Sequence, residues 1–515
     1  MTQSQQPLLT VPALRVRQWL NEWDDMLFES AERRSRPPDC FYLFSMDAAH
    51  LRALSGIQRR TLKGGKPRER DLGIQRQHDE SRSDEIGRFV RNGFPWSMLN
   101  ESQRRSGRFD DLRKPGWLPT AIVVNILRAE DQRPEGRVAK ADLVRIEDDG
   151  HSLASVLLPT GLSPDWTPSG HRPIEVIDGQ HRLWAFDGTL AEVYELPVVA
   201  FVGLDISWQA YLFWTINIKP TRINPSLAFD LYPLLRTEDW LERFEGPKVY
   251  RQTRAQELTE ALWSYEESPW FRRINMLGER GVGGVSQSAW IGALTGTFIR
   301  RVPKTGRGAG GLFGAPAGSD ELVIPWNRTQ QAAFLIFAWQ RLERAVKETK
   351  ADWARFLRHD ARARSNVPEE LLGDPAFIGR DTYLNTDQGI RAYLGVVNDL
   401  CFSGADDLRL NGWAPLDTDR GIDAESIRAE LEQLQDQPVA KFVARIATAL
   451  ADFDWRSASA PGLNEEERAI KLSFRGSGGY TEFRRQLLSF LGRGRDSVLK
   501  RHANRLLLQI RSRRR

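Results

Sequence analysis

Apolar residues in the first 235 positions of the chain come mostly in short runs between Gly, Pro and polar residues. Short apolar runs of this kind are typical of buried strands, whereas apolar residues three and four apart indicate helices. The runs predict strands at 41–46, 120–127, 174–177 and 196–202, and a hairpin made of 142–146 and 155–158. The helical spacing predicts helices at 11–35, 48–54, 83–91, 208–217 and 225–235.

Beyond about residue 240 the pattern becomes helical with long connections. Helices are predicted at 255–263, 289–298, 329–348, 388–400, 424–434 and 439–450. Two Gly-rich stretches, 278–284 and 306–318, lack the lysine and the strand-to-helix context of a P-loop and are interpreted as connections. Six tryptophans of this half are expected to pack in its core: Trp263, Trp270, Trp290, Trp326, Trp339 and Trp353.

These patterns predict an α+β fold in four parts. The expected parts are an N-terminal helical extension at 1–35, a domain with a small mixed sheet at 36–235, a helical domain at 236–470 and a basic helical tail at 471–515. Hydrophobic residues make up 41% of the chain and charged residues 27%, which is typical of a globular protein. No apolar run is long enough for a membrane span, and the first residues lack the apolar segment of a signal peptide.

The two cysteines, Cys40 and Cys401, lie far apart in the sequence. This argues against a disulfide framework or a zinc module and favours the cytoplasm. Charge is unevenly distributed, because residues 471–515 hold thirteen Lys or Arg and two acids. That segment is therefore net +11, whereas the whole chain is +5 and the rest is −6.

Basic and apolar residues alternate in the tail so that they form amphipathic helices with a cationic face. The side chains expected to contact DNA phosphates are Arg484, Arg485, Arg493, Arg495, Lys500, Arg501 and Arg505. The alternative is an ordinary solvated helix face.

The segment around residues 178–182 carries the clearest candidate chemistry. A β-branched run at 174–177 is followed by the turn signal Asp178-Gly179 and by helical spacing from Gln180. The free amides at the start of a helix attract phosphate, and Gly179 lets the backbone approach a ligand. His181 and Arg182 add donors and positive charge. We interpret the segment as a phosphate-binding, nucleotide-binding turn; the alternative is a common Asp-Gly turn with solvated charges.

Four acidic residues are candidates for a metal or base role: Glu175, Asp178, Asp187 and Asp205. Asp178 ends the strand beside the turn, where Mg²⁺ bridging phosphate oxygens is chemically reasonable. Its alternative role is to hydrogen-bond the turn backbone.

The string DGQHR at residues 178–182 resembles the DGQHR family of proteins with a ParB-like fold, found in bacterial DNA-modification and defence gene clusters. DndB-type proteins of DNA phosphorothioation and DpdB-type proteins of 7-deazaguanine DNA modification belong to it. The resemblance implies a ParB-like (ParB/sulfiredoxin-like) domain at 36–235, in which the turn holds nucleotide phosphates.

Two further blocks are similar to family patterns. Gln75 and Arg76 precede a predicted helix, and the resemblance implies that they face the cleft of the turn. Asn217 and Lys219 follow the strand at 196–202, where the family often has an aromatic-x-x-Ile-Asn pattern, and Lys219 and Arg222 are expected to reach phosphate or DNA. The alternatives are a solvated loop for the first block and a helix C-cap for Asn217.

The expected function is a nucleotide-binding, NTP-hydrolysing accessory protein of a DNA-modification or defence system. ATP or another NTP with Mg²⁺ is the expected cofactor. Asp178, Gln180, His181 and Arg182 are the expected catalytic group, and Asp178 is the expected metal ligand. The expected partners are DNA, a modification enzyme of the same gene cluster and further copies of this chain, with no membrane.

Two other classes stay open. One is a DNA-binding transcriptional regulator without turnover, as DndB-type proteins are thought to be. The other is a ParB-like nuclease, since relatives with a DGQQR string occur in restriction enzymes of the GmrSD type. The nuclease is the less favoured of the two, because His359 and His502 lie alone and no His-Asn-His cluster is present.

Overall fold

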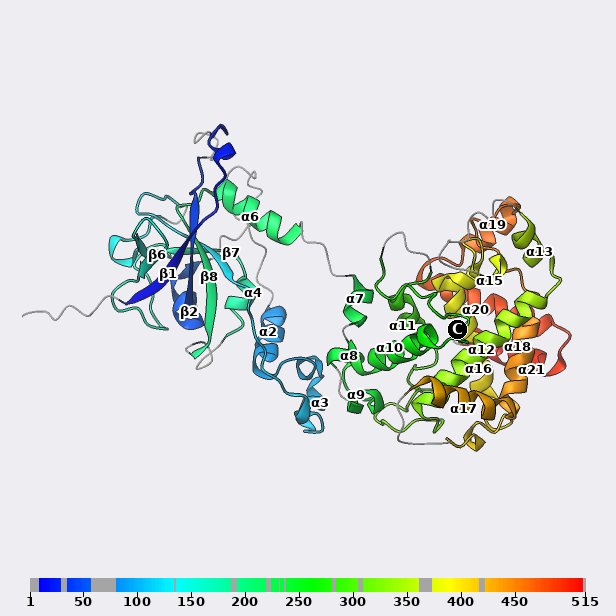
Figure 1. Cartoon of the computed structure of the whole chain (residues 1–515). Helices are drawn as coiled ribbons and strands as arrows, with labels where there is room; N and C mark the ends of the chain where they lie inside the picture. The colour runs from blue at the N-terminus through cyan, green and yellow to red at the C-terminus, as the bar shows by residue number, and fades with distance from the viewer. Residues whose placement is uncertain are drawn as a thin grey trace, which may run out of the picture. The chain divides into compact units, whose positions relative to one another are not determined.

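The structure is a computed structural model and describes residues 9–28, 35–56, 80–133, 136–186, 191, 193–218, 224–230, 232–235, 238–279, 284–303, 309–360, 373–415 and 422–512. The chain forms two compact units, Met1–Arg222 and Ile223–Arg515, which are described separately (Figure 1). The first contains the sheet and the second is helical. The expected combination of helices with a mixed sheet is therefore confirmed.

The first unit is built on an eight-stranded mixed sheet of order β3-β7-β4-β8-β2-β1-β6-β5. The strands are β1 (Thr10–Arg17), β2 (Cys40–Asp47), β3 (Ser55–Gly56), β4 (Ile122–Ile126), β5 (Arg145–Asp148), β6 (Leu153–Leu157), β7 (Ile174–Asp178) and β8 (Glu195–Val202). β4 runs parallel to β8 and antiparallel to β7. The strands predicted from short apolar runs are confirmed, and so is the hairpin, which is formed by β5 and β6.

The helix predicted within residues 11–35 is wrong, and with it the idea of a helical N-terminal extension. Residues Thr10–Arg17 are β1, paired on both sides with β2 and β6. The apolar residues that suggested a helix do not face the core, since Leu14 and Leu20 are half exposed and Leu27 is almost fully exposed. Pairing with neighbouring strands therefore decided the structure of this segment, whatever its local spacing.

Helices α1 (Ala48–Leu54), α2 (Glu80–Asn92), α3 (Glu101–Arg105), α4 (Gln180–Leu183) and α6 (Ile206–Ile218) belong to the sheet unit. The predictions for α1, α2 and α6 are confirmed, but α4 ends well before residue 188, where the sequence placed its end. Apolar residues from β2, β4, β7 and β8 form the core of this unit together with α1 and α4.

The second unit contains the remaining helices, and all six helices predicted beyond residue 240 are present in it. They are α7 (Pro225–Asp230), α8 (Tyr232–Leu235), α9 (Glu238–Glu242), α10 (Lys248–Ser264), α11 (Gln287–Gly296), α12 (Arg328–Glu348), α13 (Asp352–His359), α15 (Pro375–Ile378), α16 (Asp387–Ser403), α17 (Ala424–Gln435), α18 (Pro438–Ala451), α19 (Glu465–Leu472), α20 (Gly476–Arg493) and α21 (Ser497–Ser512). The segment predicted as one helix at 225–235 is described as α7 and α8, and it lies beyond the division at Arg222.

Tryptophans occupy the centre of the helical unit, as expected. Trp270, Trp290 and Trp339 are fully buried and contact one another edge to face, with ring centroids 4.9–5.6 Å apart. Trp326 and Trp353 are also buried, and Trp263 packs against the same core. These residues stabilise the unit by burying large apolar surfaces.

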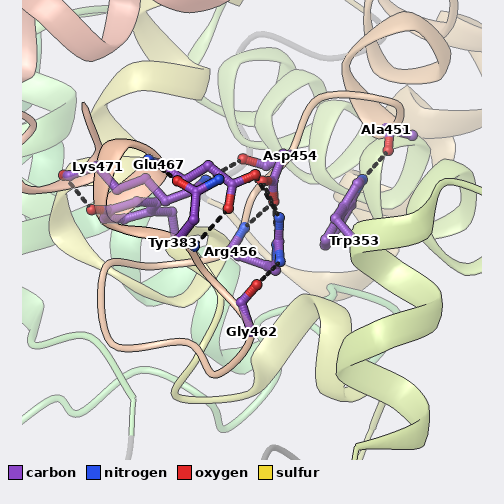
Figure 2. A network of polar contacts seen from close by, with 9 residues as sticks. Trp353, Tyr383, Ala451, Asp454, Arg456, Gly462, Glu467 and Lys471 are labelled. Carbon is purple, nitrogen blue, oxygen red and sulfur yellow. Dashed lines mark hydrogen bonds and ion pairs between the residues drawn. The ribbon is translucent and has the colours of Figure 1, made fainter. Parts of the chain in front are cut away.

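A polar network fastens α19 to the loop that follows α18 (Figure 2). The Lys471 ammonium donates to the Asp454 carbonyl at 2.9 Å, and the Arg456 guanidinium pairs with the Asp454 carboxylate at 2.9 Å. Burial lowers the pKa of Lys471, against the opposing charge of Asp454. Lys471, the first cation of the predicted basic tail, is therefore a buried structural group. α20 and α21 also pack into the core, against α16 and α18.

Candidate functional site around Asp178

The predicted strand, turn and helix around residue 179 are confirmed. β7 ends at Asp178, and Gly179 takes the left-handed conformation with a φ of +94° as the N-cap of α4. A side chain at this position would be strained, because its Cβ would lie 2.8 Å from the Ile122 side chain. Glycine is therefore required to connect the strand to the helix here.

Arg182 folds back onto the end of the strand. Its guanidinium lies 2.7 Å from the Asp178 carboxylate and donates to the Thr120 carbonyl at 2.8 Å. Both charged side chains are largely covered, with 18% and 19% exposed. Arg182, which the sequence analysis expected to bind phosphate, is thus paired with the Asp178 carboxylate of the same chain.

Asn217 joins this pair from a distant part of the sequence. It lies near the end of α6, which packs on β7, and its amide donates to Asp178 Oδ1 at 3.3 Å. The same amide donates to the Phe213 carbonyl at 2.9 Å, a local role near the helix end. Asp178, Arg182 and Asn217 therefore meet beside Gly179.

Gln180 and His181 begin α4. The Ser83 hydroxyl of α2 donates to the His181 carbonyl at 3.2 Å, which fixes the helix against α2. Gln180 Oε1 is buried and has no hydrogen-bond partner within the described ranges. A buried acceptor without a donor is destabilising, so a ligand hydroxyl reaching this oxygen would gain a favourable bond.

Glu175 is not a free base but a buried structural carboxylate. Arg133 binds both of its oxygens, at 2.6 and 2.9 Å, and Asn125 and Gln209 also donate to it. Burial raises the pKa of Glu175, but these hydrogen bonds and the Arg133 charge outweigh burial and hold it below the ordinary value. The sequence analysis did not identify Arg133, Asn125 and Gln209 as donors to Glu175. A glutamate inside an apolar strand nevertheless indicates a buried charge that needs partners.

Metal ligation by Asp178 finds no support in the donor set. Both of its oxygens already receive hydrogen bonds, from Arg182 and Asn217. Asp205 lies elsewhere and accepts bonds from the Ser35 amide and hydroxyl. Across the residues that the structure describes, no three His, Cys, Asp or Glu side chains gather in a way that could hold a metal ion.

Several expected site residues lie outside the described ranges, so the structure does not bear on them. They are Gln75, Arg76, Asp187, Lys219 and Arg222.

The cations expected to bind DNA fall into two groups. Arg484 pairs with the buried carboxylate of Asp399 at 2.6 Å, and Arg485 pairs with Glu482, so both are engaged within the protein. The other five are exposed around the end of α20 and along α21: Arg493, Arg495, Lys500, Arg501 and Arg505. Only this second group forms a solvent-facing cationic surface.

Comparisons of the chain with protein-family models, curated proteins and solved structures gave no match. Among the helices of the described ranges, none has both the length and the apolar character needed to cross a lipid bilayer.

Proposed function

We propose that this protein binds a nucleotide at the turn formed by Asp178, Gly179 and α4, and serves a bacterial DNA-modification or defence system. The observation that carries the proposal is the meeting of Asp178, Arg182 and Asn217 beside a left-handed glycine at the end of β7. The resemblance of residues 178–182 to the DGQHR family supplies the link to DNA modification.

Phosphate binding at this turn is an exchange of anions on Arg182. A guanidinium binds carboxylate and phosphate with the same planar pair of donors. The Asp178 carboxylate occupies Arg182 when no ligand is bound. An incoming phosphate takes its place, and Asn217 is the nearby neutral donor. The unpartnered Gln180 Oε1 is an acceptor for a hydroxyl such as those of a ribose.

Because both Asp178 oxygens accept hydrogen bonds in this structure, no metal-dependent step is assigned to Asp178. Asp178 holds Arg182 in place when no ligand is bound, and it competes with phosphate for the Arg182 guanidinium. Binding is separate from hydrolysis, which needs its own measurement. Phosphate release from ATP, with and without duplex DNA, distinguishes an NTP-hydrolysing protein from one that only binds.

The direct test is equilibrium binding of ATP, GTP and CTP to the full chain and to Arg182→Ala. Loss of a charge-assisted hydrogen bond corresponds to at least about tenfold weaker binding. The matched control is Arg17→Gln, which removes a 59% exposed arginine of β1, a strand that β4, β8 and β2 separate from β7. Equal affinities for all three proteins would refute the site.

A second candidate function is DNA binding without turnover, as in a transcriptional regulator. The exposed cations of α20 and α21 favour it, because five exposed basic side chains lie close together in the sequence, between residues 493 and 505. Such a surface binds the phosphate backbone with a strong salt dependence. Sequence-specific DNA binding together with no nucleotide binding would support this function over the first.

A further inference from the structure

A cavity of about 430 Å³ lies in the sheet unit, away from the turn at Asp178. It is bounded by Cys40 and Tyr42 at the start of β2, by residues 127–129 after β4, by residues 143–146 around the start of β5, and by Val202 at the end of β8. Cavities of about 300–1,000 Å³ with mostly apolar walls are the usual sites of small-molecule ligands.

Curling of the sheet creates this cavity. β5 is an edge strand and is separated from β8 by β6, β1 and β2 in the strand order, yet residues of both strands face the same space. Cys40 and Tyr42 alternate along β2 with outward residues and continue the inward row of Phe44 and Met46, which lies in the core. The cavity is therefore the open end of the sheet's own interior.

Two arginines line the cavity, and no acidic residue of the described ranges does. Arg128 and Arg145 are both exposed, and neither forms an ion pair with any residue in the described ranges. Arg128 lies across Gly203, where an added Cβ would come within 2.4 Å of its Nε, and its guanidinium donates to the Val202 carbonyl at 3.3 Å. The absence of a side chain at Gly203 thus gives Arg128 room beside the end of β8.

The opposite wall is held rigidly. The Tyr42 hydroxyl donates to Asp148 Oδ2 at 2.5 Å, and Arg15 lies 3.8 Å from the same carboxylate oxygen. These contacts fix Tyr42 in place and leave Asp148 occupied by donors. The remaining lining is aliphatic, with Leu127, Val144 and Ile146 among its members.

We propose that this cavity binds a small organic anion, with its apolar body among the aliphatic side chains and its acidic group at Arg128 and Arg145. Burial of an apolar body supplies affinity, and the two guanidiniums supply orientation and selectivity for a carboxylate, sulfonate or phosphate group. The site is separate from the nucleotide site and does not depend on it.

The reactivity of Cys40 can report whether a ligand occupies this cavity. Cys40 lines the cavity and is partly exposed, whereas Cys401, the other cysteine, is fully buried in the helical unit. Iodoacetamide should therefore alkylate Cys40 first, and a ligand in the cavity should slow that reaction. Cys401 is the internal control for unfolding, since its modification requires the core to open.

The probe is 8-anilinonaphthalene-1-sulfonate, an apolar body with one sulfonate, followed by its fluorescence and by mass spectrometry of Cys40. We expect saturable binding and protection of Cys40 in the wild-type protein. Arg145→Gln and Arg128→Gln should each weaken both effects at least about tenfold, the loss of one charge-assisted bond. Circular dichroism reports whether each variant is folded.

A neighbouring aromatic groove provides the matched control. This second cavity, about 400 Å³, shares Pro38 and Cys40 with the first but is lined by Trp19, Trp208 and Tyr211, and none of its lining residues in the described ranges is an arginine. Tyr211→Ala should therefore leave probe affinity and Cys40 protection unchanged, as should Arg182→Ala at the nucleotide turn. Failure of the probe to bind, binding that Tyr211→Ala abolishes, or binding that Arg128→Gln and Arg145→Gln leave unchanged would each overturn the proposal.

Discussion

The two units use charged side chains in different ways. In the helical unit, charged groups pair with one another inside the protein: Asp399 lies between Arg300 and Arg484, and Asp454 lies between Arg456 and Lys471 (Figure 2). In the sheet unit, Arg128 and Arg145 have no ion-pair partner among the described residues, and Arg182 is held by an exchangeable carboxylate. The arginines of the two proposed small-ligand sites therefore lie in the sheet unit, which also holds the buried Glu175–Arg133 pair.

The architecture explains this contrast. Strands end at the edges of a sheet, so polar residues following each strand meet there, next to glycines such as Gly179 and Gly203 that allow close approach. The helical unit instead closes around a core rich in tryptophan. The exposed cations of α20 and α21 belong to the helical unit.

The largest expected effect is on the helical core. Trp339→Ala removes a fully buried ring that contacts Trp270 and Trp290, and should lower the free energy of unfolding of that unit by about 3–5 kcal/mol. Chemical denaturation measures the change. Trp117→Ala is the control, because Trp117 is 78% exposed and should change stability by less than about 0.5 kcal/mol. Loss of ATP binding in the folded Trp339→Ala protein would contradict the assignment of ligand binding to the sheet unit.

The next largest effect concerns the buried Glu175. Glu175→Gln leaves Arg133 without its counter-charge and should destabilise the sheet unit by about 3 kcal/mol at neutral pH. The folded-state pKa of Glu175 lies below its ordinary value of 4.5, so its contribution is fully present above that value and is lost as pH falls through the folded-state pKa.

The thermal midpoint measured between neutral and acidic pH checks this sign. The wild-type protein should lose stability as pH falls below the ordinary glutamate range, and Glu175→Gln should remove part of that loss. Glu195→Gln is the control, since this exposed carboxylate accepts from Ser45 at the surface. If the thermal midpoints of Glu175→Gln and Glu195→Gln fall equally at acidic pH, Glu175 does not contribute to the loss of stability.

The smallest effect on stability is expected at the cationic surface. Arg501→Glu together with Arg505→Glu changes exposed side chains and should shift the unfolding free energy by less than about 0.5 kcal/mol per site. DNA binding should nevertheless weaken, and the slope of log K against log salt should fall by about 2. Arg344→Glu with Lys347→Glu on exposed positions of α12 is the charge-matched control. Equal losses in both double variants would indicate a non-specific charge effect.

Much of the framework could be predicted from the sequence, because buried strands and amphipathic helices leave periodic signals. β4, β7 and β8 are confirmed. β1 was missed because its neighbours in the sheet, and not its own pattern, decide its structure.

The pairing of Arg182 with Asp178 also escaped prediction, although the spacing of four residues allows it. The cavity had no sequence signal at all. Its walls come from β2, β5, β8 and the segment after β4, which only the curled sheet brings together. Long-range juxtapositions of this kind are set by tertiary structure and not by local periodicity.

The most direct test of the nucleotide site is the sign of the change in ATP affinity on Asp178→Asn. If the Asp178 carboxylate competes with phosphate for Arg182, its removal should tighten ATP binding about tenfold, with or without Mg²⁺. Weaker ATP binding by Asp178→Asn, in a variant that keeps its fold by circular dichroism, would contradict the anion exchange on which the account depends.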